Sequence, residues 1–465
     1  MRREKLESFP DWHVVLVDER GETNLGDIRG LARMLETSFA GRLVVLKAAR
    51  ARGYLALYLA AVLAKVPVMI LNEETSEDFL DQVISRFRPA GIFGFEARPL
   101  GYDVSGILPG VNMLTARCEP EAAHPDLAVL LGTSGSTGTP KFVRLSRRAV
   151  FHNATAISER LPIRKTDVAI TSLPYSYSYG LSVVNTHFIS GARILVSESP
   201  LTSKDFWSQV KHFNVRSLGG VPTTYRTLQQ LGWDPREYPS LRYMTQAGGR
   251  LRNDERQYFL DLLEPCGIDF FVMYGQTEAT ARITIAPPSL LHKRIDSAGR
   301  ALADGELSIK DPDTRGFGEV VYRGPNVMMG YATEASDLAN GDLCNGKLLT
   351  GDIGSLKDGI LTINGRATRI AKIFGKRFSL DEVENWLAQY AQCVVVAQDD
   401  AIAVAVGSGA VPENLQKDLA AYLGVHPTGV RTLTIPALPQ MSNGKTNYKE
   451  VQKILDAHFA VESEA

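Results

Sequence analysis

Short apolar runs separated by longer amphipathic stretches mark the first 300 residues of the chain. In the first part, such runs occupy residues 14–17, 43–46, 66–70 and 91–94. In the middle of the chain they recur at residues 168–173, 193–196, 215–219, 241–245 and 269–273. Buried strands that alternate with helices are typical of parallel sheets covered by helices. The pattern therefore predicts α/β layers rather than an all-β sandwich.

The pattern changes after Gly305. Short strands separated by Gly, Asp and Asn turns are expected at residues 307–310, 318–322 and 359–364, which predicts a small barrel-like β subdomain. Farther on, Ser379 and Glu382 form a capping box that opens a helix. Alternating strands and helices follow it at residues 393–397, 401–406 and 415–423. We expect an N-terminal domain over residues 1–365 and a small α+β C-terminal domain over residues 366–465.

Composition and charge exclude several classes of protein. The 465 residues include 51 basic and 52 acidic side chains, so no strongly basic face for nucleic acid is expected. The most apolar window, residues 55–71, is interrupted by Lys65 and Pro67 and is too short to span a membrane. The first residues lack the apolar core of a secretory signal. The four cysteines lie far apart, without zinc or disulfide spacing, so we expect a cytoplasmic protein.

One loop between two predicted strands carries the clearest chemical signal. Residues 133–141 read T-S-G-S-T-G-T-P-K, between an apolar run at 127–131 and a second run at 142–145. Glycines let the backbone approach a ligand, and N–H groups, hydroxyls and a lysine together bind phosphate oxygens. The loop differs from the common G-x-x-x-x-G-K-[ST] pattern, because Thr139 and Pro140 follow Gly138. We therefore expect a phosphate-binding loop of another kind.

Five later segments complete a set. Residues 246–249 read Q-A-G-G, residues 274–278 read Y-G-Q-T-E, T-G-D at 350–352 precedes G-R at 365–366, and residues 439–445 read P-Q-M-S-N-G-K. In this order, over nearly the full length, the segments resemble the signatures of the adenylate-forming superfamily. That superfamily includes acyl-CoA synthetases, peptide-synthetase adenylation domains and luciferases.

The resemblance implies a two-step reaction. A carboxylate attacks the α-phosphorus of ATP to give acyl-AMP and pyrophosphate, and a thiol then displaces AMP. It implies a large N-terminal part, a hinge and a mobile C-terminal domain. Lys445 is the implied catalytic lysine, Thr277 contacts phosphate, and Glu278 with Thr277 holds Mg²⁺. The implied nucleotide-binding residues are Thr133, Ser134, Gly135, Ser136, Thr137, Gly138, Lys141, Gly248, Gly249, Tyr274, Asp352 and Arg366.

Residues 173–181 read L-P-Y-S-Y-S-Y-G-L and resemble an acyl-CoA synthetase segment, with Tyr177 in place of its usual histidine. Sites that activate α-amino acids usually carry an aspartate in this region, because a buried ammonium needs a carboxylate partner. No acidic residue lies between Asp167 and Glu198. We therefore expect a plain carboxylic acid, bound in a pocket that includes Tyr177, Tyr179 and Gly180.

The thiol acceptor is left open by the sequence. Lys372 and Gly375 resemble the segment that approaches a pantetheine arm, which belongs either to CoA or to a carrier protein. CoA is favoured, because the chain has no carrier domain of its own. Thr368 stands at the hinge position where the superfamily usually has Asp or Lys, and Phe142 stands where glycine is usual. These two departures motivate an alternative of another class, a nucleotide-binding relative without catalysis; a luciferase-type oxygenase is a third.

Overall fold

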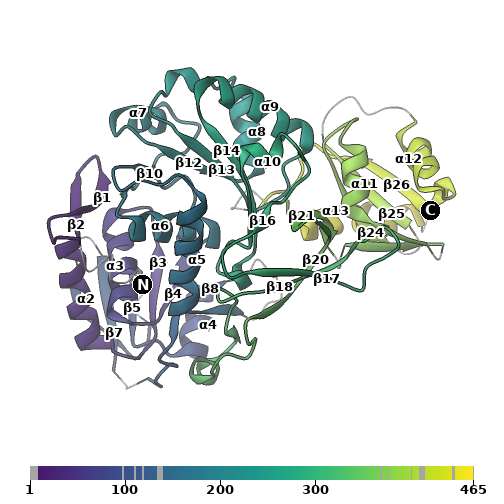
Figure 1. Cartoon of the computed structure of the whole chain (residues 1–465). Helices are drawn as coiled ribbons and strands as arrows, with labels where there is room; N and C mark the ends of the chain where they lie inside the picture. Colours follow the sequence, from purple (N-terminus) through teal and green to yellow (C-terminus); the bar gives the residue numbers. More distant parts are fainter. Residues whose placement is uncertain are drawn as a thin grey trace.

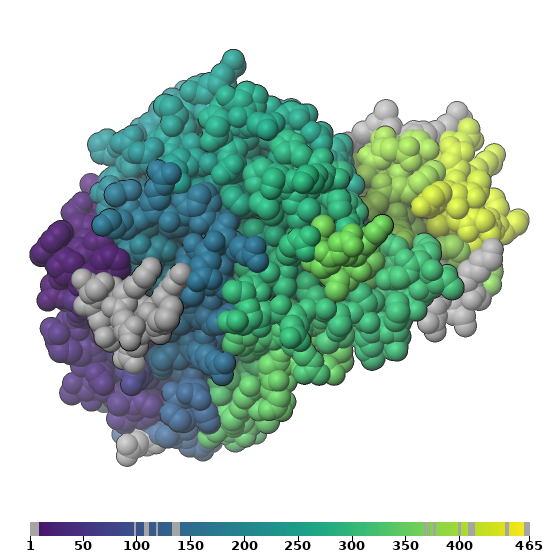
Figure 2. All heavy atoms as spheres, viewed as in Figure 1, coloured from purple at the N-terminus to yellow at the C-terminus, as the bar shows by residue number. Residues whose placement is uncertain are grey.

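The computed structural model describes residues 9–96, 99–108, 111–117, 120–132, 140–366, 369–374, 376–398, 401–407, 414–441 and 446–463. Two large sheets and the helices around them form the main body of the molecule (Figure 1). A smaller antiparallel sheet extends from that body toward a C-terminal part, which protrudes as a separate lobe (Figure 2).

The first large sheet has the strand order β19-β9-β8-β4-β3-β5-β7-β6. Its strands are β3 (Val44–Ala48), β4 (Val68–Asn72), β5 (Gly91–Phe93), β6 (Tyr102–Leu108), β7 (Val111–Ala116), β8 (Leu127–Gly132), β9 (Phe142–Ser146) and β19 (Gly330–Ala332). The central ladder β8-β4-β3-β5 is parallel, and the flanking strands are antiparallel. The predicted parallel layer is therefore confirmed at its centre, and the predicted run at residues 142–145 is the antiparallel strand β9, whereas β6, β7 and β19 were not predicted.

The second large sheet has the order β16-β15-β14-β13-β12-β10-β11-β1-β2. Its strands are β1 (Val14–Asp18), β2 (Gly21–Asn24), β10 (Val168–Ile170), β11 (Arg193–Leu195), β12 (Ser217–Gly220), β13 (Tyr243–Gln246), β14 (Asp269–Tyr274), β15 (Thr284–Ala286) and β16 (Arg300–Ala301). Strands β1 and β10–β14 run parallel, so β12, β13 and β14 end at the same edge. In open α/β sheets ligands bind at this edge.

Helices link the strands, and some of them pack against both sheets. The helices of the main body are α2 (Leu25–Phe39), α3 (Arg52–Ala64), α4 (Glu77–Phe87), α5 (Arg147–Arg160), α6 (Ser178–Ser190), α7 (Lys204–His212), α8 (Pro222–Gln230), α9 (Asn253–Leu263) and α10 (Pro288–Leu291). One core cluster joins residues of α3, α5 and α6 to strands of both sheets. Helices α3 and α6 are buried on nearly all sides, as expected for helices between two layers.

The third sheet is antiparallel, as predicted, with the order β17-β18-β20-β21. Its strands are β17 (Glu306–Lys310), β18 (Gly318–Arg323), β20 (Lys347–Lys357) and β21 (Ile360–Arg366). The sequence pattern did not predict β20, in which polar and glycine residues interrupt the apolar ones. The T-G-D segment lies within this strand rather than in a turn.

The C-terminal part is α+β. It comprises β22 (Ile370–Ile373), β23 (Lys376–Ser379), α11 (Leu380–Leu387), β24 (Cys393–Gln398), β25 (Ala401–Val406), α12 (Leu415–Leu423), β26 (Val430–Thr434) and α13 (Tyr448–Ser463). Its two core clusters contain only residues from Ala371 onward, so this part buries an apolar core of its own. Helix α11 begins at the predicted cap, where Ser379 Oγ accepts from the Glu382 N–H at 3.3 Å. Over the residues described, no helix combines the length and apolar character needed to cross a membrane.

Candidate functional site

The Y-G-Q-T-E segment lies where β14 ends. Gly275 is required there by close packing, because a Cβ at this position would lie 1.9 Å from the Ala281 carbonyl oxygen. The chain then forms one turn of 3₁₀-helix, η3 (Thr277–Ala279), which places Thr277 and Glu278 beside the strand end. Thr277 Oγ1 donates a hydrogen bond to Ser178 Oγ at 3.1 Å. The segment is therefore a compact turn held against α6.

Asp352 connects this turn to the third sheet. The Tyr274 hydroxyl donates to Asp352 Oδ2 at 2.6 Å, and Arg366 Nε lies 3.3 Å from Oδ1. Asp352 and Arg366 are cross-strand partners on β20 and β21, which explains the spacing between T-G-D and G-R. Burial raises the pKa of Asp352, whereas the contacts with Tyr274 and Arg366 act in the opposite direction. The two motifs thus meet at one carboxylate.

Lys141 and Glu278 meet at Tyr331. The Tyr331 hydroxyl donates to Glu278 Oε1 at 3.0 Å, and Lys141 Nζ lies 3.6 Å from the centre of the Tyr331 ring. Burial raises the pKa of Tyr331, and the adjacent Glu278 carboxylate raises it further, so the phenol stays protonated and donates. We call Lys141, Tyr274, Glu278, Asp352 and Arg366 the strand-end cluster. Asp352 contacts Tyr274 and Arg366, Lys141 and Glu278 share Tyr331, and the turn at residues 274–278 links the two groups.

Several predicted residues lie outside the described part of the chain. They are Thr133, Ser134, Gly135, Ser136, Thr137, Gly138, Thr368, Gly375 and Lys445. Lys372 belongs to β22, but its side chain is also outside that part. Gly132 and Phe142, on either side of the predicted phosphate loop, are register partners of β8 and β9. The loop therefore connects two adjacent strand ends next to Lys141.

Phe142 is a core residue. Its side chain is 1% exposed and packs edge-on against Phe87, with 5.4 Å between the ring centres. The aromatic ring that stands in place of the usual glycine therefore fills space beneath the first sheet.

The tyrosine run divides between two environments. Tyr175 packs near Tyr58, and its hydroxyl donates to the Lys47 carbonyl at 3.3 Å, away from the strand-end cluster. Tyr177 and Tyr179 lie on the other side of the chain, with ring centres 6.4 Å apart. Only these two of the three tyrosines are therefore available to line an acid pocket.

Two glycines keep the backbone close to these tyrosines. A Cβ on Gly180 would lie 2.2 Å from the Pro174 carbonyl oxygen, so this glycine lets α6 begin directly after the tyrosine run. Gly248 follows β13 with φ +81, and a Cβ there would lie 2.4 Å from the Tyr177 hydroxyl. Gly249 packs against the Pro222 ring. The Q-A-G-G loop is therefore in contact with Tyr177.

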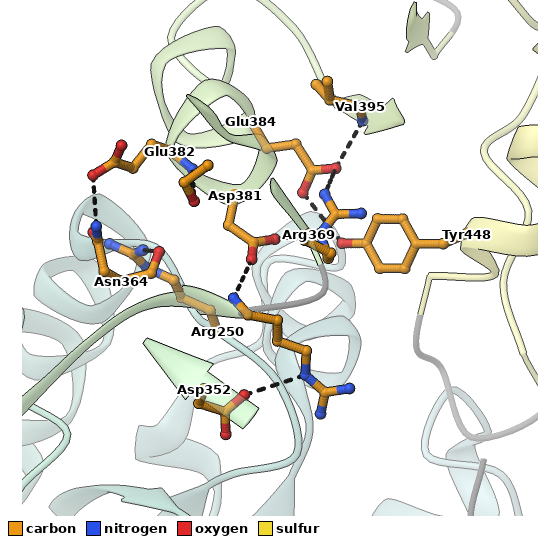
Figure 3. Close-up of polar contacts among 11 residues, drawn as sticks. Arg250, Asp352, Asn364, Arg369, Asp381, Glu382, Glu384, Val395 and Tyr448 are labelled. Atoms are coloured by element: carbon orange, nitrogen blue, oxygen red, sulfur yellow. Dashed lines mark hydrogen bonds and ion pairs between the residues drawn. The ribbon is translucent and has the colours of Figure 1, made fainter. Parts of the chain in front are cut away.

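The end of β21 is bound to the C-terminal part through α11 (Figure 3). The Arg366 N–H donates to Asp381 Oδ2 at 2.8 Å, and Asn364 Nδ2 donates to Glu382 Oε1 at 2.5 Å. Arg369 bridges Asp381 and Glu384, at 2.6 Å to each. The first turn of α11 thus holds the strand that carries Arg366.

Two residues of this region were not predicted from the sequence. Tyr331 lies on β19, and its hydroxyl and ring contact two predicted site residues. Arg282 is fully buried four residues after Glu278. A charged residue inside the apolar segment A-R-I-T-I-A was a signal that could have identified Arg282; no local pattern distinguished Tyr331.

Comparisons with known proteins place this geometry in a family. The model of the AMP-binding enzyme family matches residues 27–332. A 2-succinylbenzoate–CoA ligase of Staphylococcus aureus (strain MRSA252) is 27% identical over 336 residues, which cover 69% of this chain and 65% of the relative. The same enzyme of strain JH9 is 27% identical over 266 residues, covering 57% of this chain and 52% of the relative. The chain thus matches between about half and two thirds of the length of these curated relatives.

Solved structures share the fold over almost the whole chain. The O-succinylbenzoate coenzyme A synthetase of Bacillus subtilis with AMP has a TM-score of 0.76 and 19% identity, covering 97% of both chains. ATP-bound MatB of Rhodopseudomonas palustris has a TM-score of 0.75 and 19% identity, covering 97% of this chain and 98% of that one. The predicted fold class is confirmed by this likeness. From the family model, which matches more than half of its residues, the chain belongs to the family of AMP-binding enzymes.

Proposed function

We propose that the protein activates a carboxylic acid with ATP through an acyl-AMP intermediate and then transfers the acyl group to the thiol of CoA. The observation that carries the proposal is the strand-end cluster. Tyr274, Asp352 and Arg366 join two distant motifs at one carboxylate, at the edge of the sheet where ligands bind. The names of the Staphylococcus relatives, which are acid–CoA ligases, support the same reaction.

In this proposal the cluster binds the nucleotide. Asp352 accepts hydrogen bonds from the two ribose hydroxyls, because a carboxylate has acceptor sites for both. The Tyr274 ring lies along the adenine, with Gly248 and Gly249 on its other side. Lys141 and the loop of residues 133–138 bind phosphate oxygens. Arg366 lies beside Asp352, where its exposed guanidinium reaches ribose or phosphate.

The residues present suit Mg²⁺ shared with phosphate rather than a site made by protein alone. Over the residues described, no group of three His, Cys, Asp or Glu side chains could hold a metal ion. Glu278 offers one carboxylate, oriented by Tyr331, and Thr277 offers a hydroxyl. Mg²⁺ is commonly held by one or two carboxylates together with substrate phosphates. When bound, the ion would neutralise charge on the phosphate oxygens.

The chemistry needs positioning and charge stabilisation. A carboxylate oxygen of the acid attacks the α-phosphorus, and the bond to pyrophosphate breaks. Lys445 stabilises the negative charge that grows between the carboxylate and the α-phosphate. In the second step the thiolate attacks the acyl carbon, and AMP leaves with the oxygen that came from the acid.

The C-terminal domain would move between the two steps. Lys445 and the pantetheine-side residues Lys372 and Gly375 belong to it, so one domain must present different residues in turn. We propose a boundary at residue 365 and a hinge at Thr368. A hinge residue only has to absorb a backbone rotation, which threonine allows. The described cysteines Cys266, Cys344 and Cys393 are free thiols, which fits the cytoplasmic location that we infer.

The proposal is tested by ATP–pyrophosphate exchange that depends on an added carboxylic acid. Lys445→Ala should lower exchange by about 10²–10³-fold, the usual cost of losing a transition-state donor. Thiolysis of supplied acyl-AMP should survive in this variant, since the lysine acts in the first step. Lys453→Ala, which changes an exposed lysine of α13, is the matched control and should leave both steps unchanged.

Two results would oppose the proposal. Exchange that is absent with every acid, while ATP still binds, would indicate a nucleotide-binding relative without catalysis. Equal loss of both half-reactions in Lys445→Ala would contradict a domain that changes position between them. A transfer assay that compares free CoA with a carrier-protein phosphopantetheine then identifies the acceptor.

A further inference from the structure

Three arginine side chains are buried in the described part of the chain, and one of them differs from the other two. Arg144 donates hydrogen bonds to the carbonyls of Asn340, Met329 and Gly341. Arg256 donates likewise to three backbone carbonyls. Arg282 is 2% exposed; among the described residues no backbone carbonyl accepts a hydrogen bond from it, and its Nε, like that of Arg144, has no hydrogen-bond partner. Its guanidinium instead lies over the Tyr179 ring, 4.9 Å from the ring centre.

The charge of Arg282 is not balanced by a carboxylate. Among the described residues, none of the carboxylates forms an ion pair with it. Asp167, which acts electrostatically on nearby His187 and Tyr243, is itself paired with Arg242 at 2.8 Å. A buried ion without a partner is costly, because it has lost its hydration. A bound anion would remove that cost.

A small cavity of about 10 Å³ adjoins the guanidinium. We call it the Arg282 cavity; Arg282, His187, Ser217, Tyr243 and Thr245 are among its lining residues. Its volume suits about one water molecule. Burial lowers the pKa of His187 to about 4, so its imidazole is neutral near neutral pH. Arg282 then supplies the only charge among the side chains that line the cavity.

The hydroxyl groups around the cavity already have acceptors for their protons. The Tyr179 hydroxyl donates to the Thr245 carbonyl at 2.7 Å. His187 Nδ1 lies 2.8 Å from the Val183 carbonyl, which places the imidazole proton there, so Nε2 accepts from the Tyr243 hydroxyl at 3.0 Å. Among the described residues Arg282 therefore meets only neutral groups, including the Tyr179 hydroxyl and ring. Neutral oxygens do not balance its positive charge.

The backbone holds Arg282 in this orientation. The amides of Asn153 and Asn326 both donate to its carbonyl oxygen, at 2.8 and 3.1 Å. Directly before it, Thr280 and Ala281 have φ of +54 and +94. Positive φ at two successive residues other than glycine is unfavourable and is found where a site constrains the chain. The backbone is therefore strained at the two residues that precede the buried Arg282.

The cavity lies next to the tyrosines of the proposed acid site. Gly248 touches Tyr177, Tyr177 faces Tyr179, and the Tyr179 hydroxyl lies beside Gly219, which also lines the cavity. An acid whose reacting carboxylate meets the nucleotide near Gly248 would extend along these tyrosines toward Arg282. We propose that Arg282 is a specificity-determining residue and that the substrate is a dicarboxylic acid whose second carboxylate pairs with Arg282. The proposal rests on the proposed function and names its substrate class.

The test compares acids of equal length that differ only at the far end. Linear dicarboxylic acids, the matching monocarboxylic acids and the monomethyl esters of the diacids are compared by ATP–pyrophosphate exchange. In the wild type, the diacid should exceed both partners in kcat/KM by on the order of 10²-fold or more. Arg282→Met should abolish that preference, mainly through KM, and Arg282→Lys should restore part of it. Arg256→Lys, a buried arginine outside the acid site, should leave the ratio unchanged.

Binding of non-hydrolysable acyl-adenylate mimics, with and without a terminal carboxylate, gives a readout that needs no turnover. Equal affinity of the two mimics for the wild type would overturn the proposal even if Arg282→Met failed to fold. If the monomethyl ester had the same kcat/KM as its diacid, the site would recognise a hydrogen-bond acceptor rather than a negative charge. This result would also overturn the proposal. Absence of exchange with any acid contradicts the proposed function instead, and the mimics then still decide the role of Arg282.

Discussion

The two ends of the candidate site differ in how their charges are balanced. In the strand-end cluster both carboxylates already have partners from other segments of the chain: Asp352 meets Tyr274 and Arg366, and Glu278 meets Tyr331. At the acid end, Arg282 is buried against a ring and a small cavity. We interpret this difference as a difference in role. The groups that bind the nucleotide, which are needed for every acid, are already paired in the free protein. Arg282, which selects the acid in our proposal, has no carboxylate partner until the acid binds.

The largest expected effect separates these two roles. Asp352→Ala should lower kcat/KM by about 10²-fold or more with every acid, because the variant loses a buried charged acceptor and leaves Arg366 without its partner. The ratio between diacid and monoacid should not move. Steady-state kinetics on one matched pair of acids measures both quantities. A change in the ratio would show that the two ends are not independent.

A pH effect on stability should come from the acid end. Burial lowers the pKa of His187 to about 4 from 6.5, so the unfolded chain binds a proton in this window that the folded protein does not. Stability present above pH 6.5 is therefore lost as the pH falls toward 4, by about 2 kcal/mol at pH 5. Urea unfolding at pH 7 and pH 5 measures the loss. His187→Gln should reduce it, and an unchanged pH dependence in that variant would contradict this assignment.

A smaller effect on kcat/KM should come from the contact between Gly248 and Tyr177, which lies between the two ends of the candidate site. Gly248→Ala places a Cβ 2.4 Å from the Tyr177 hydroxyl at a positive φ, which should lower kcat/KM by about 10-fold. Gly267→Ala is a matched control, with φ +68 and open space around the new Cβ. Kinetics of both variants separate the steric contact from backbone strain. Equal effects in the two would assign the loss to strain alone.

The smallest expected effect concerns Tyr331. Tyr331→Phe keeps the ring beneath Lys141 but removes the hydrogen bond to Glu278, a net loss of about 1 kcal/mol. The Mg²⁺ concentration that gives half-maximal exchange should rise a few-fold. Tyr258→Phe, at a partly exposed tyrosine of α9, is the control. An unchanged Mg²⁺ dependence would mean that Tyr331 does not orient the carboxylate.

The sequence predicted those parts of the structure that local patterns determine. Apolar runs identified the parallel strands, because each run is buried on both faces. The short edge strands β15, β16 and β19 were missed, since their pairing depends on distant partners rather than on their own residues. Strand β20 was missed because polar and glycine residues interrupt its apolar positions.

The same limit applies to the candidate site. Asp352 and Arg366 could be proposed from motifs, whereas their pairing across β20 and β21 required the register of the hairpin. Tyr331 and Arg282 reach their positions through tertiary packing, so no spacing in the sequence links Tyr331 to Glu278 or Arg282 to Tyr179. The tyrosine run is the clearest example. Tyr175 contacts the Lys47 carbonyl and Tyr177 contacts Gly248, and the sequence did not predict that these two tyrosines lie on different sides of the chain.

Isotope transfer tests the central claim, acid activation through acyl-AMP, most directly. The protein would be incubated with ATP, Mg²⁺, CoA and an acid whose carboxylate oxygens are ¹⁸O. Attack by the carboxylate on the α-phosphorus predicts one ¹⁸O in the AMP released after thiol transfer, detected by mass spectrometry. Label in inorganic phosphate, or thioester formed without labelled AMP, would contradict the account.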